Sequence, residues 1–336
     1  MANGSTPAIQ RIANRPIACH AVESLVAAGV ADVAVIAPAC MIDEVRAHVE
    51  DELAAGVQAT FLPQRERNDL LGALTAAASF VGDDEAVVHF ADGLLGQPLD
   101  QLPRACADGV PDLLFLLHCC AGAREGLAPA TQALLGVTEL AAGRTRLSLA
   151  DVCLFGPGAL GRAVDAAAHL APDAGLIEIA QHAAAEGEAL EAALVRSWRR
   201  YAGDPHDLLE LNRIVLDQQP LQAELIDTGD NRIEGRVTID ASAEVSSSII
   251  LGPCIIGPHA RVMSSYIGPY TSIGANTDIE GVEIVHSIIS EGVHIKHISG
   301  RIERSTIGRR ASIFRDFRLP RAMRLHVGEG VEVALE

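Results

Sequence analysis

The chain has 336 residues, 49% of them hydrophobic and only 3% aromatic, which suits about two domains with aliphatic cores. Its formal net charge of -18 gives it no electrostatic reason to bind nucleic acid or an anionic membrane. The seven cysteines include no CxxC pair and no stretch resembles a signal peptide or a membrane span, so we expect a cytoplasmic protein without a disulfide framework or a zinc site.

The first 155 residues alternate short apolar runs with amphipathic stretches. The apolar runs predict buried strands and the amphipathic stretches predict helices, the first two of which end at Gly29 and Gly56. Strands that alternate with helices are typical of a mainly parallel α/β sheet. The expected strands are residues 33–37, 59–62, 86–90 and 113–117, and the expected helices are residues 18–28, 43–55 and 68–80.

A more helical stretch follows, with amphipathic segments at 177–189 and 207–216. From residue 233 the aliphatic residues recur about every six positions, as in Ile267, Ile273 and Ile279. This is the hexapeptide pattern of a parallel β-helix, in which each aliphatic side chain stacks on one a coil away. We therefore expect an α/β domain at 1–217, a linker at 218–232, a β-helix of about four or five coils at 233–313 and a tail at 314–336.

Five segments resemble the long form of the glucose-1-phosphate thymidylyltransferases, in which a nucleotidyltransferase-like Rossmann-type domain precedes a left-handed β-helix. They are ANRPI at 13–17, the pair PQ and LG within 63–72, FADGLL at 90–95, GDPHDLLELNR at 203–213 and DNRIEGRV at 230–237. The family's reaction joins a sugar 1-phosphate to the α-phosphate of a nucleoside triphosphate, and it needs Mg²⁺, cations and N–H donors around the phosphates. The resemblance implies base and sugar contacts at Gln64 and Gly72, and a magnesium ligand at Asp92.

The same resemblance shows departures from the family's pattern. The glycine-rich phosphate loop and the strand before it are not found, since residues 1–7 offer only Gly4, so we expect a sheet with a gap or with another segment in that place. Pro7 stands where a lysine is expected, Leu176 where the sugar-binding glutamate is expected, and Tyr201 where the second metal-binding aspartate is expected. The sequence DTG at 227–229 lies beyond the family's helix and fits a turn.

These departures favour a catalytically impaired protein that binds, regulates or scaffolds in nucleotide-sugar or antibiotic-related metabolism. We expect a homo-oligomer, with an active paralogue or a pathway enzyme as a further partner. We expect its ligand to be a nucleoside, a sugar or a nucleotide sugar, because a triphosphate needs cations around it and Lys296 is the single lysine of the chain. Two alternatives stay open: residual nucleotidyl transfer with Mg²⁺, and acyl transfer with a histidine base on the β-helix. The histidines of that region are His259, His286, His294, His297 and His326.

Overall fold

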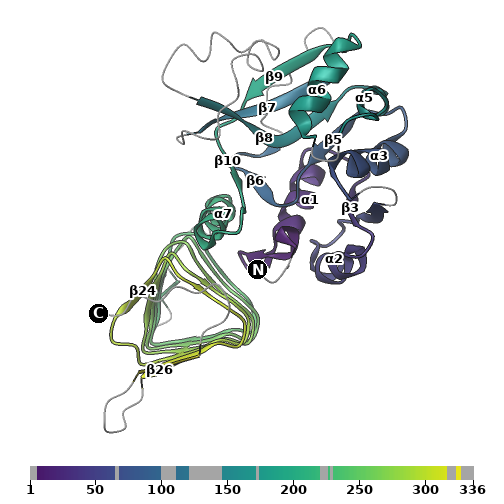
Figure 1. The fold of residues 1–336 in the computed structure, drawn as a ribbon. Helices are drawn as coiled ribbons and strands as arrows, with labels where there is room; N and C mark the ends of the chain where they lie inside the picture. Colours follow the sequence, from purple (N-terminus) through teal and green to yellow (C-terminus); the bar gives the residue numbers. More distant parts are fainter. Residues whose placement is uncertain are drawn as a thin grey trace. The chain divides into compact units, whose positions relative to one another are not determined.

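The computed structural model describes residues 6–64, 68–99, 111–120, 146–171, 174–219, 226–227, 230–315 and 323–326. Its internal contacts divide the chain into two compact units (Figure 1). The first comprises Met1–Ile9 and Ile17–Arg199, and the second comprises Gln10–Pro16 and Arg200–Glu336. This division differs from the expected boundary at residue 217. Within the described ranges, no helix has the length and apolar character needed to cross a bilayer.

The first unit begins with a parallel pair of strands, β3 (Ala34–Pro38) and β4 (Thr60–Gln64). Both lie within two residues of the strands expected at 33–37 and 59–62, because each is a short apolar run between polar segments. The helices around this pair are α1 (Ile17–Ala27), α2 (Ile42–Val49) with a 3-10 turn (Glu50–Glu52), and α3 (Leu70–Val81), while a short 3-10 turn (Pro7–Ile9) lies ahead of α1. Gly29 follows the end of α1 with a φ angle of 94°, which a glycine adopts without steric cost where a helix ends. Gly56, with a φ of 87°, lies in a turn beyond the helix expected at 43–55, which ends earlier, at Val49 with a 3-10 turn to Glu52.

A second sheet of the first unit has the strand order β5-β8-β7-β9. Strands β7 and β9 are parallel, whereas β8 runs antiparallel to both β5 and β7. The sheet is therefore mixed: β5, β7 and β9 run in one direction, as expected for a mainly parallel sheet, and of its described strands β8 runs against them. Strand β8 escaped prediction because Ser148 and Asp151 interrupt its apolar pattern. The bounds are β5 (Ala86–His89), β7 (Leu113–Cys120), β8 (Arg146–Phe155) and β9 (Leu190–Leu194).

The two sheets are not joined by a hydrogen-bonded strand in the described part of the chain. There, β3 pairs only with β4, and β5 pairs only with β8. The apolar core is nevertheless shared, since Val35 of β3 and Val87 of β5 pack in one cluster. The pair β3-β4 and the sheet β5-β8-β7-β9 thus form separate hydrogen-bonded groups in the described part of the first unit. Residues 1–5, which include Gly4, lie outside the described residues.

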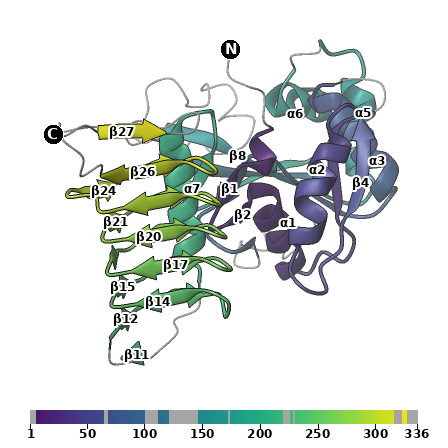
Figure 2. The same cartoon turned by 90° about the horizontal axis from the view of Figure 1, so that it is seen from below.

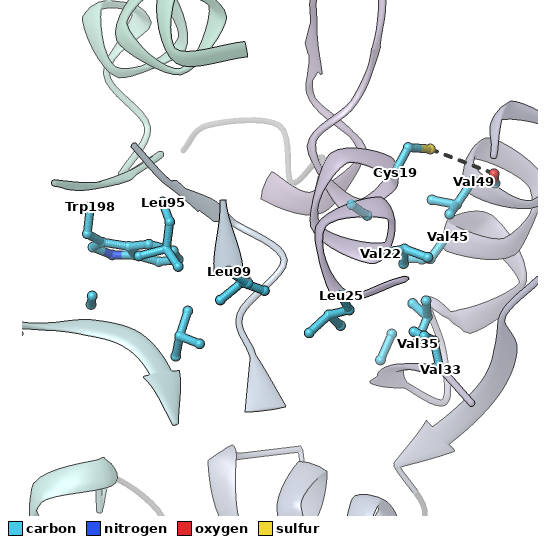
Figure 3. Packing of buried hydrophobic residues seen from close by; sticks show 14 of the residues in the cluster. Cys19, Val22, Leu25, Val33, Val35, Val45, Val49, Leu95, Leu99 and Trp198 are labelled. Atoms are coloured by element: carbon cyan, nitrogen blue, oxygen red, sulfur yellow. Dashed lines mark hydrogen bonds between the residues drawn. The ribbon is translucent and has the colours of Figure 1, made fainter. Parts of the chain in front are cut away.

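The shared cluster also holds a small sheet of β6 (Gly93–Leu95) and β10 (Trp198–Arg200). Figure 3 shows Trp198 beside Leu95, with the aliphatic side chains of α1, α2 and β3 completing the cluster. A Cβ atom on Gly93 would lie 2.5 Å from the Trp198 ring. Only glycine therefore fits against this ring without a shift of the chain.

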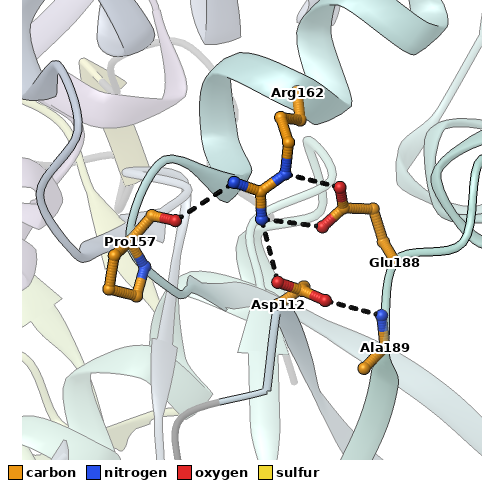
Figure 4. A network of polar contacts seen from close by, with 5 residues as sticks. All are labelled: Asp112, Pro157, Arg162, Glu188 and Ala189. Atoms are coloured by element: carbon orange, nitrogen blue, oxygen red, sulfur yellow. Dashed lines mark hydrogen bonds and ion pairs between the residues drawn. The ribbon is translucent and has the colours of Figure 1, made fainter.

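Helices α5 (Ala159–Ala167) and α6 (Leu176–Ala185) pack with α3 on the second sheet. Arg162 of α5 holds the ends of this layer together (Figure 4). Its guanidinium donates to both carboxylate oxygens of Glu188 and to Asp112, which itself accepts the backbone N–H of Ala189 at 2.8 Å. Asp112 precedes β7 and Glu188 precedes β9, so one arginine fixes the start of two neighbouring strands.

The second unit contains a parallel β-solenoid of about five turns with the triangular cross-section of a left-handed β-helix (Figures 1 and 2). Successive coils pair in register, as in Ile250 with Ile267 and Ile267 with Ile284. All three of these side chains are fully buried, so the aliphatic column predicted from the sequence does point inward. Corner residues take left-handed backbone angles, among them His259 and Asn276 with φ of 54°.

Each side of the triangle is one sheet. The first has the order β11-β12-β15-β18-β21-β24, the second β13-β16-β19-β22-β25, and the third β14-β17-β20-β23-β26-β27. Antiparallel strands β11 and β27 cover one edge of the first and third sheets, which protects those edges from other chains. The first sheet comprises β11 (Ile226–Asp227), β12 (Arg232–Glu234), β15 (Ile249–Leu251), β18 (Tyr266–Ile267), β21 (Glu283–Val285) and β24 (Arg301–Glu303). The second comprises β13 (Val237–Ile239), β16 (Cys254–Ile256), β19 (Thr271–Ile273), β22 (Ile288–Ile289) and β25 (Thr306–Ile307). The third comprises β14 (Glu244–Ser246), β17 (Arg261–Met263), β20 (Asp278–Glu280), β23 (His294–Lys296), β26 (Ser312–Arg315) and β27 (Met323–His326).

A helix and a hairpin from distant parts of the sequence complete the second unit. Helix α7 (Pro205–Asp217) starts at Asp204, whose carboxylate accepts the His206 N–H. The hairpin consists of β1 (Arg11–Ile12) and β2 (Arg15–Pro16). Fully buried Asn212 of α7 joins them to the solenoid: its Oδ1 accepts from the Ala13 N–H and the Ser272 hydroxyl, and its Nδ2 donates to the Tyr270 carbonyl.

Candidate functional site

Gln64 is the last residue of β4, and only 8% of its surface is exposed. Its Nε2 donates to the Asp69 carbonyl at 3.2 Å, while its buried Oε1 has no hydrogen-bond partner within the described ranges. A buried acceptor without a partner costs about 1–3 kcal/mol. The Gln64 side chain therefore carries one buried acceptor without a partner in the described part of the chain.

Gly72 lies in the first turn of α3, close in sequence to Gln64. Its N–H donates to Asp69 Oδ1 at 2.8 Å, which makes Asp69 the N-cap of the helix. The N–H of Gly72 is therefore engaged within the chain and is not available to a nucleobase. Gln64, Asp69 and Gly72 form one hydrogen-bonded group at the end of β4 and the start of α3.

Asp92 lies in the turn between β5 of the second sheet and β6 of the small β6-β10 sheet. Its neighbour His89 ends β5 and was not singled out from the sequence, because a lone histidine in an apolar run carries no signal of function. The His89 ring stands edge-on to Trp198, with centroids 5.5 Å apart, and its Nδ1 lies 2.9 Å from the Phe90 carbonyl. Burial lowers the pKa of His89 to about 4, so the imidazole is neutral at pH 7 and supplies no charge for a phosphate.

Leu176 occupies the place where the resemblance expects a sugar-binding glutamate. It is the first residue of α6 and is 7% exposed, packed in the core of the second sheet with residues such as Phe155 and Leu160. The nearby Glu178 carboxylate accepts the Gly175 N–H at 3.0 Å and caps the helix. The start of α6 thus serves helix capping and core packing.

The other two departures from the family's pattern are Pro7 and Tyr201. Pro7 is exposed and begins the 3-10 turn that precedes the hairpin, and a proline has neither a charge nor an N–H to offer. Tyr201 belongs to the second unit and follows β10 directly. Its pKa is raised, mainly by burial and then by the charges of Asp207 and Asp204, so its phenol stays neutral at pH 7.

The donor set of the described residues does not fit the family's magnesium site. Mg²⁺ is held by carboxylate oxygens in near-octahedral geometry, and the resemblance implies two aspartates. Only Asp92 matches, with Tyr201 in the second place. Across the part of the chain that the structure describes, no three His, Cys, Asp or Glu side chains lie close enough together to hold a metal ion. Of the sequence DTG, Asp227 ends β11, which pairs antiparallel with β12, and residues 228–229 lie outside the described residues.

The lone lysine and two of the β-helix histidines share a pair of carboxylates on the third sheet: His294 Nδ1 lies 3.9 Å from Asp278 Oδ2, and His297 Nε2 lies 3.9 Å from Glu280 Oε1. Lys296 Nζ lies 2.6 Å from Asp278 Oδ2 and 3.4 Å from Glu280 Oε2, so its charge is already paired. Of the histidines, His259, His286 and His297 occupy three different corners of the solenoid, and His294 lies on β23. His326 lies on β27, and its side chain is outside the described set.

Comparison with known proteins identifies the family. Residues 2–109 match the family model described as nucleotidyl transferase. The glucose-1-phosphate thymidylyltransferase of Streptomyces antibioticus is 30% identical, with 97% of this chain and 92% of the relative covered. That of Streptomyces griseus is 29% identical over 95% of this chain and 90% of the relative. The low-salt glycan biosynthesis nucleotidyltransferase Agl11 of Haloferax volcanii is 31% identical over 96% and 92%. With relatives at this level over almost their whole length, the chain belongs to the sugar-1-phosphate nucleotidyltransferase family.

Proposed function

We propose that this protein is a nucleotidyltransferase-fold subunit that binds a nucleoside, a sugar or a nucleotide sugar and does not itself carry out efficient nucleotidyl transfer. The observation that carries the proposal is Leu176. At the position of the family's sugar-binding carboxylate, this chain has a leucine that is 7% exposed within the core. A buried leucine forms no hydrogen bond with a sugar hydroxyl, and reopening this position would break the start of α6.

The electrostatics of the other positions support the same proposal. Transfer between two anionic reactants needs positive charge around the phosphates. His89 is neutral at pH 7, Tyr201 is neutral, and Lys296 is held by two carboxylates. A triphosphate with about four negative charges would meet a chain of net charge -18 with little to offset the repulsion. A nucleoside or a sugar meets no such penalty.

Gln64 supports retained binding. Its buried Oε1 acceptor, which has no partner in the described part of the chain, sits at the carboxyl end of β4, where ligands of open α/β sheets commonly bind. Replacing Gln64 by leucine would keep a side chain of similar size and remove the acceptor. We expect calorimetry with thymidine and with dTDP-glucose to show binding by the wild type that weakens about tenfold or more in Gln64→Leu. If neither ligand binds the wild type, the domain does not bind through this residue.

The catalytic half of the proposal is tested by a pyrophosphate-release assay with dTTP, glucose 1-phosphate and Mg²⁺. The Streptomyces griseus relative, assayed in parallel, serves as the positive control. Loss of a single phosphate or metal contact lowers a rate by about a hundredfold or more, so we expect this protein to be at least about a thousandfold slower. Robust turnover that disappears in Asp92→Asn would overturn the proposal. A trace rate unchanged in Asp92→Asn would come from a contaminating enzyme and leave the proposal standing.

This protein's place in metabolism follows from the same chemistry. A subunit that binds a nucleotide sugar without making it depends on another enzyme to supply that compound. We propose an active paralogue or another enzyme of nucleotide-sugar metabolism as its partner. Mixing the purified chain with the Streptomyces griseus relative and following the relative's turnover tests regulation of this kind directly.

A further inference from the structure

One outer side of the solenoid has a banded arrangement of charged and apolar side chains. It is the outward face of the sheet formed by β12, β15, β18, β21 and β24, and we call it the banded face. In each strand the middle residue points inward, so the first and third positions form two outward columns. From the first coil to the fifth, one column is Arg232, Ile249, Tyr266, Glu283 and Arg301, and the other is Glu234, Leu251, Gly268, Val285 and Glu303.

The middle of the banded face is apolar and accessible. Ile249 is 43% exposed, more than the other exposed large hydrophobic residues of the described chain, Phe80 and Leu194. Leu251, Tyr266 and Val285 are partly exposed on neighbouring rungs. Single exposed apolar residues are ordinary, but a contiguous apolar patch rimmed by charge marks an interaction surface. The outer face of the third sheet differs, because it has charge in its middle coil, where Asp278 of β20 pairs with Lys296 of β23.

Charged pairs close the banded face at both ends. Arg232 Nε lies 2.7 Å from Glu234 Oε1 in the first coil. Arg301 lies 3.1 Å from Glu283 and stands over the Tyr266 ring at 5.9 Å from its centroid. Both columns therefore begin and end with charge, and the sign of the charge differs between the columns in the first and the last coil.

We propose that the banded face binds the banded face of a second copy of this chain, about a two-fold axis parallel to the stacking direction of the coils. This axis places each coil beside the same coil of the partner. The Arg232 column of one chain then faces the Glu234 column of the other. Four of the five rows are then complementary across the interface: Arg232 faces Glu234, Ile249 faces Leu251, Tyr266 faces Gly268 and Arg301 faces Glu303. In the remaining row Glu283, which is paired with Arg301 of its own chain, faces Val285. An isologous contact of this kind closes on itself as a dimer.

Charge excludes the other two-fold arrangement. An axis perpendicular to the stacking direction would reverse the coil order and place each column against itself. Arg232 would then face Arg301, and Glu234 would face Glu303, so that like charges meet at both ends. Like charges across an interface cost several kcal/mol. The sequence of the two columns thus selects the parallel arrangement.

The dimensions of the banded face set the strength of this contact. Five rungs about 4.8 Å apart, on strands about 10 Å long, give a patch about 24 Å tall and 10 Å wide, which is an area of about 240 Å². This is smaller than the standard interface, which buries about 800 Å² per partner. We therefore expect a dimer that forms at micromolar concentration and dissociates on dilution. The proposal is independent of whether the protein transfers nucleotides.

Sedimentation velocity from about 0.5 to 100 μM tests the contact on the full chain. Ile249→Glu should weaken dimerisation by about a hundredfold or more, and Phe80→Glu, at a similarly exposed apolar site on the first unit, should leave it unchanged. Arg232→Glu should weaken it by about tenfold, because the new carboxylate at position 232 would face Glu234 twice across the axis. The exchange Arg232→Glu with Glu234→Arg should restore wild-type dimerisation. Circular dichroism confirms that each variant is folded.

Three outcomes would overturn the proposal. A wild type that is monomeric at 100 μM (about 10⁻⁴ M) would show that no second copy binds. An oligomer unaffected by Ile249→Glu would place the contact on another surface. A dimer that becomes tighter in Arg232→Glu would show the reversed arrangement, since the new carboxylate would then face Arg301 of the partner subunit.

Discussion

Replacing Asn212 by leucine should destabilise the second unit by about 2–5 kcal/mol. Leucine has the same branched shape as asparagine and favours helices, so the change removes hydrogen bonds without opening a cavity or breaking α7. Three groups lose their partner: the Ala13 N–H at 2.8 Å, the Ser272 hydroxyl at 2.6 Å and the Tyr270 carbonyl at 3.0 Å.

The magnitude depends on how well each group can find another partner. Ala13 is 2% exposed and Ser272 is fully buried, so the Ala13 N–H and the Ser272 hydroxyl do not reach water easily. Each of these groups costs about 1–3 kcal/mol of folding free energy when it is left without a hydrogen-bond partner. The Ser272 hydroxyl can rotate toward another acceptor, and the partly exposed Tyr270 can turn its carbonyl toward water. We therefore place the total below the sum of three full penalties.

Urea unfolding followed by two probes measures this cost. Far-UV circular dichroism reports on both units, whereas Trp198 is the only tryptophan and packs in the core of the first unit. The two units can unfold in separate steps, so the unfolding curve of each probe is fitted with its own midpoint. We expect the transition of the β-helix, seen by circular dichroism, to move to lower urea.

A double-mutant cycle provides the decisive control. Ser272→Ala alone should cost about 1 kcal/mol, because Asn212 keeps its other two partners. In the double variant the orphaned hydroxyl is gone, so the combined loss should fall short of the sum of the single losses by about 1 kcal/mol. Additive losses, or a loss below about 1 kcal/mol for Asn212→Leu, would refute the role of Asn212 as a buried link.

Two further predictions concern packing and thiol chemistry. Gly93→Ala should lower the free energy of unfolding of the first unit by about 1–3 kcal/mol and shift the Trp198 fluorescence, because the new Cβ would lie 2.5 Å from that ring. The control is Gly161→Ala, which has no atom within 4 Å of its Cβ site and should not lower that free energy in the same assay. Exposed Cys40 and Cys119 should react rapidly with Ellman's reagent, and buried Cys254, whose pKa burial raises to about 12, should react only after unfolding. Fast labelling of Cys254 in the native protein, read by mass spectrometry, would contradict this burial.

Local patterns predicted most of the elements correctly. Strands β3, β4, β5 and β7 were found because each is an apolar run bounded by polar or turn residues. The solenoid was found because its inward columns repeat the same aliphatic residue on every coil, as Ile250, Ile267 and Ile284 do. The direction of β8 was not predictable in this way, since the sequence of a strand does not state which neighbour it joins.

The candidate site was predictable only in part. The resemblance led to Gln64 and Asp92, but it did not show that Asp69 occupies the Gly72 N–H. The partners of Asn212 were also missed, because a polar residue in an amphipathic helix is ordinarily a solvated one. Its hydrogen bonds reach residues 199 positions earlier and 60 positions later in the sequence. No periodicity within one helix carries information of that range.

The hairpin at residues 10–16 makes the order of synthesis matter for this protein. The hairpin leaves the ribosome early, yet its Asn14 side chain bonds to the Ile273 carbonyl, 259 residues further along the chain. At about 5–20 residues per second, the wait between the two is about 13–50 s. During that time the first unit can fold, while the hairpin, directly ahead of α1 in the sequence, still lacks its partners. The hairpin is therefore accessible to a chaperone that binds nascent chains. If the ribosome stalls before residue 273, the hairpin stays without its partners.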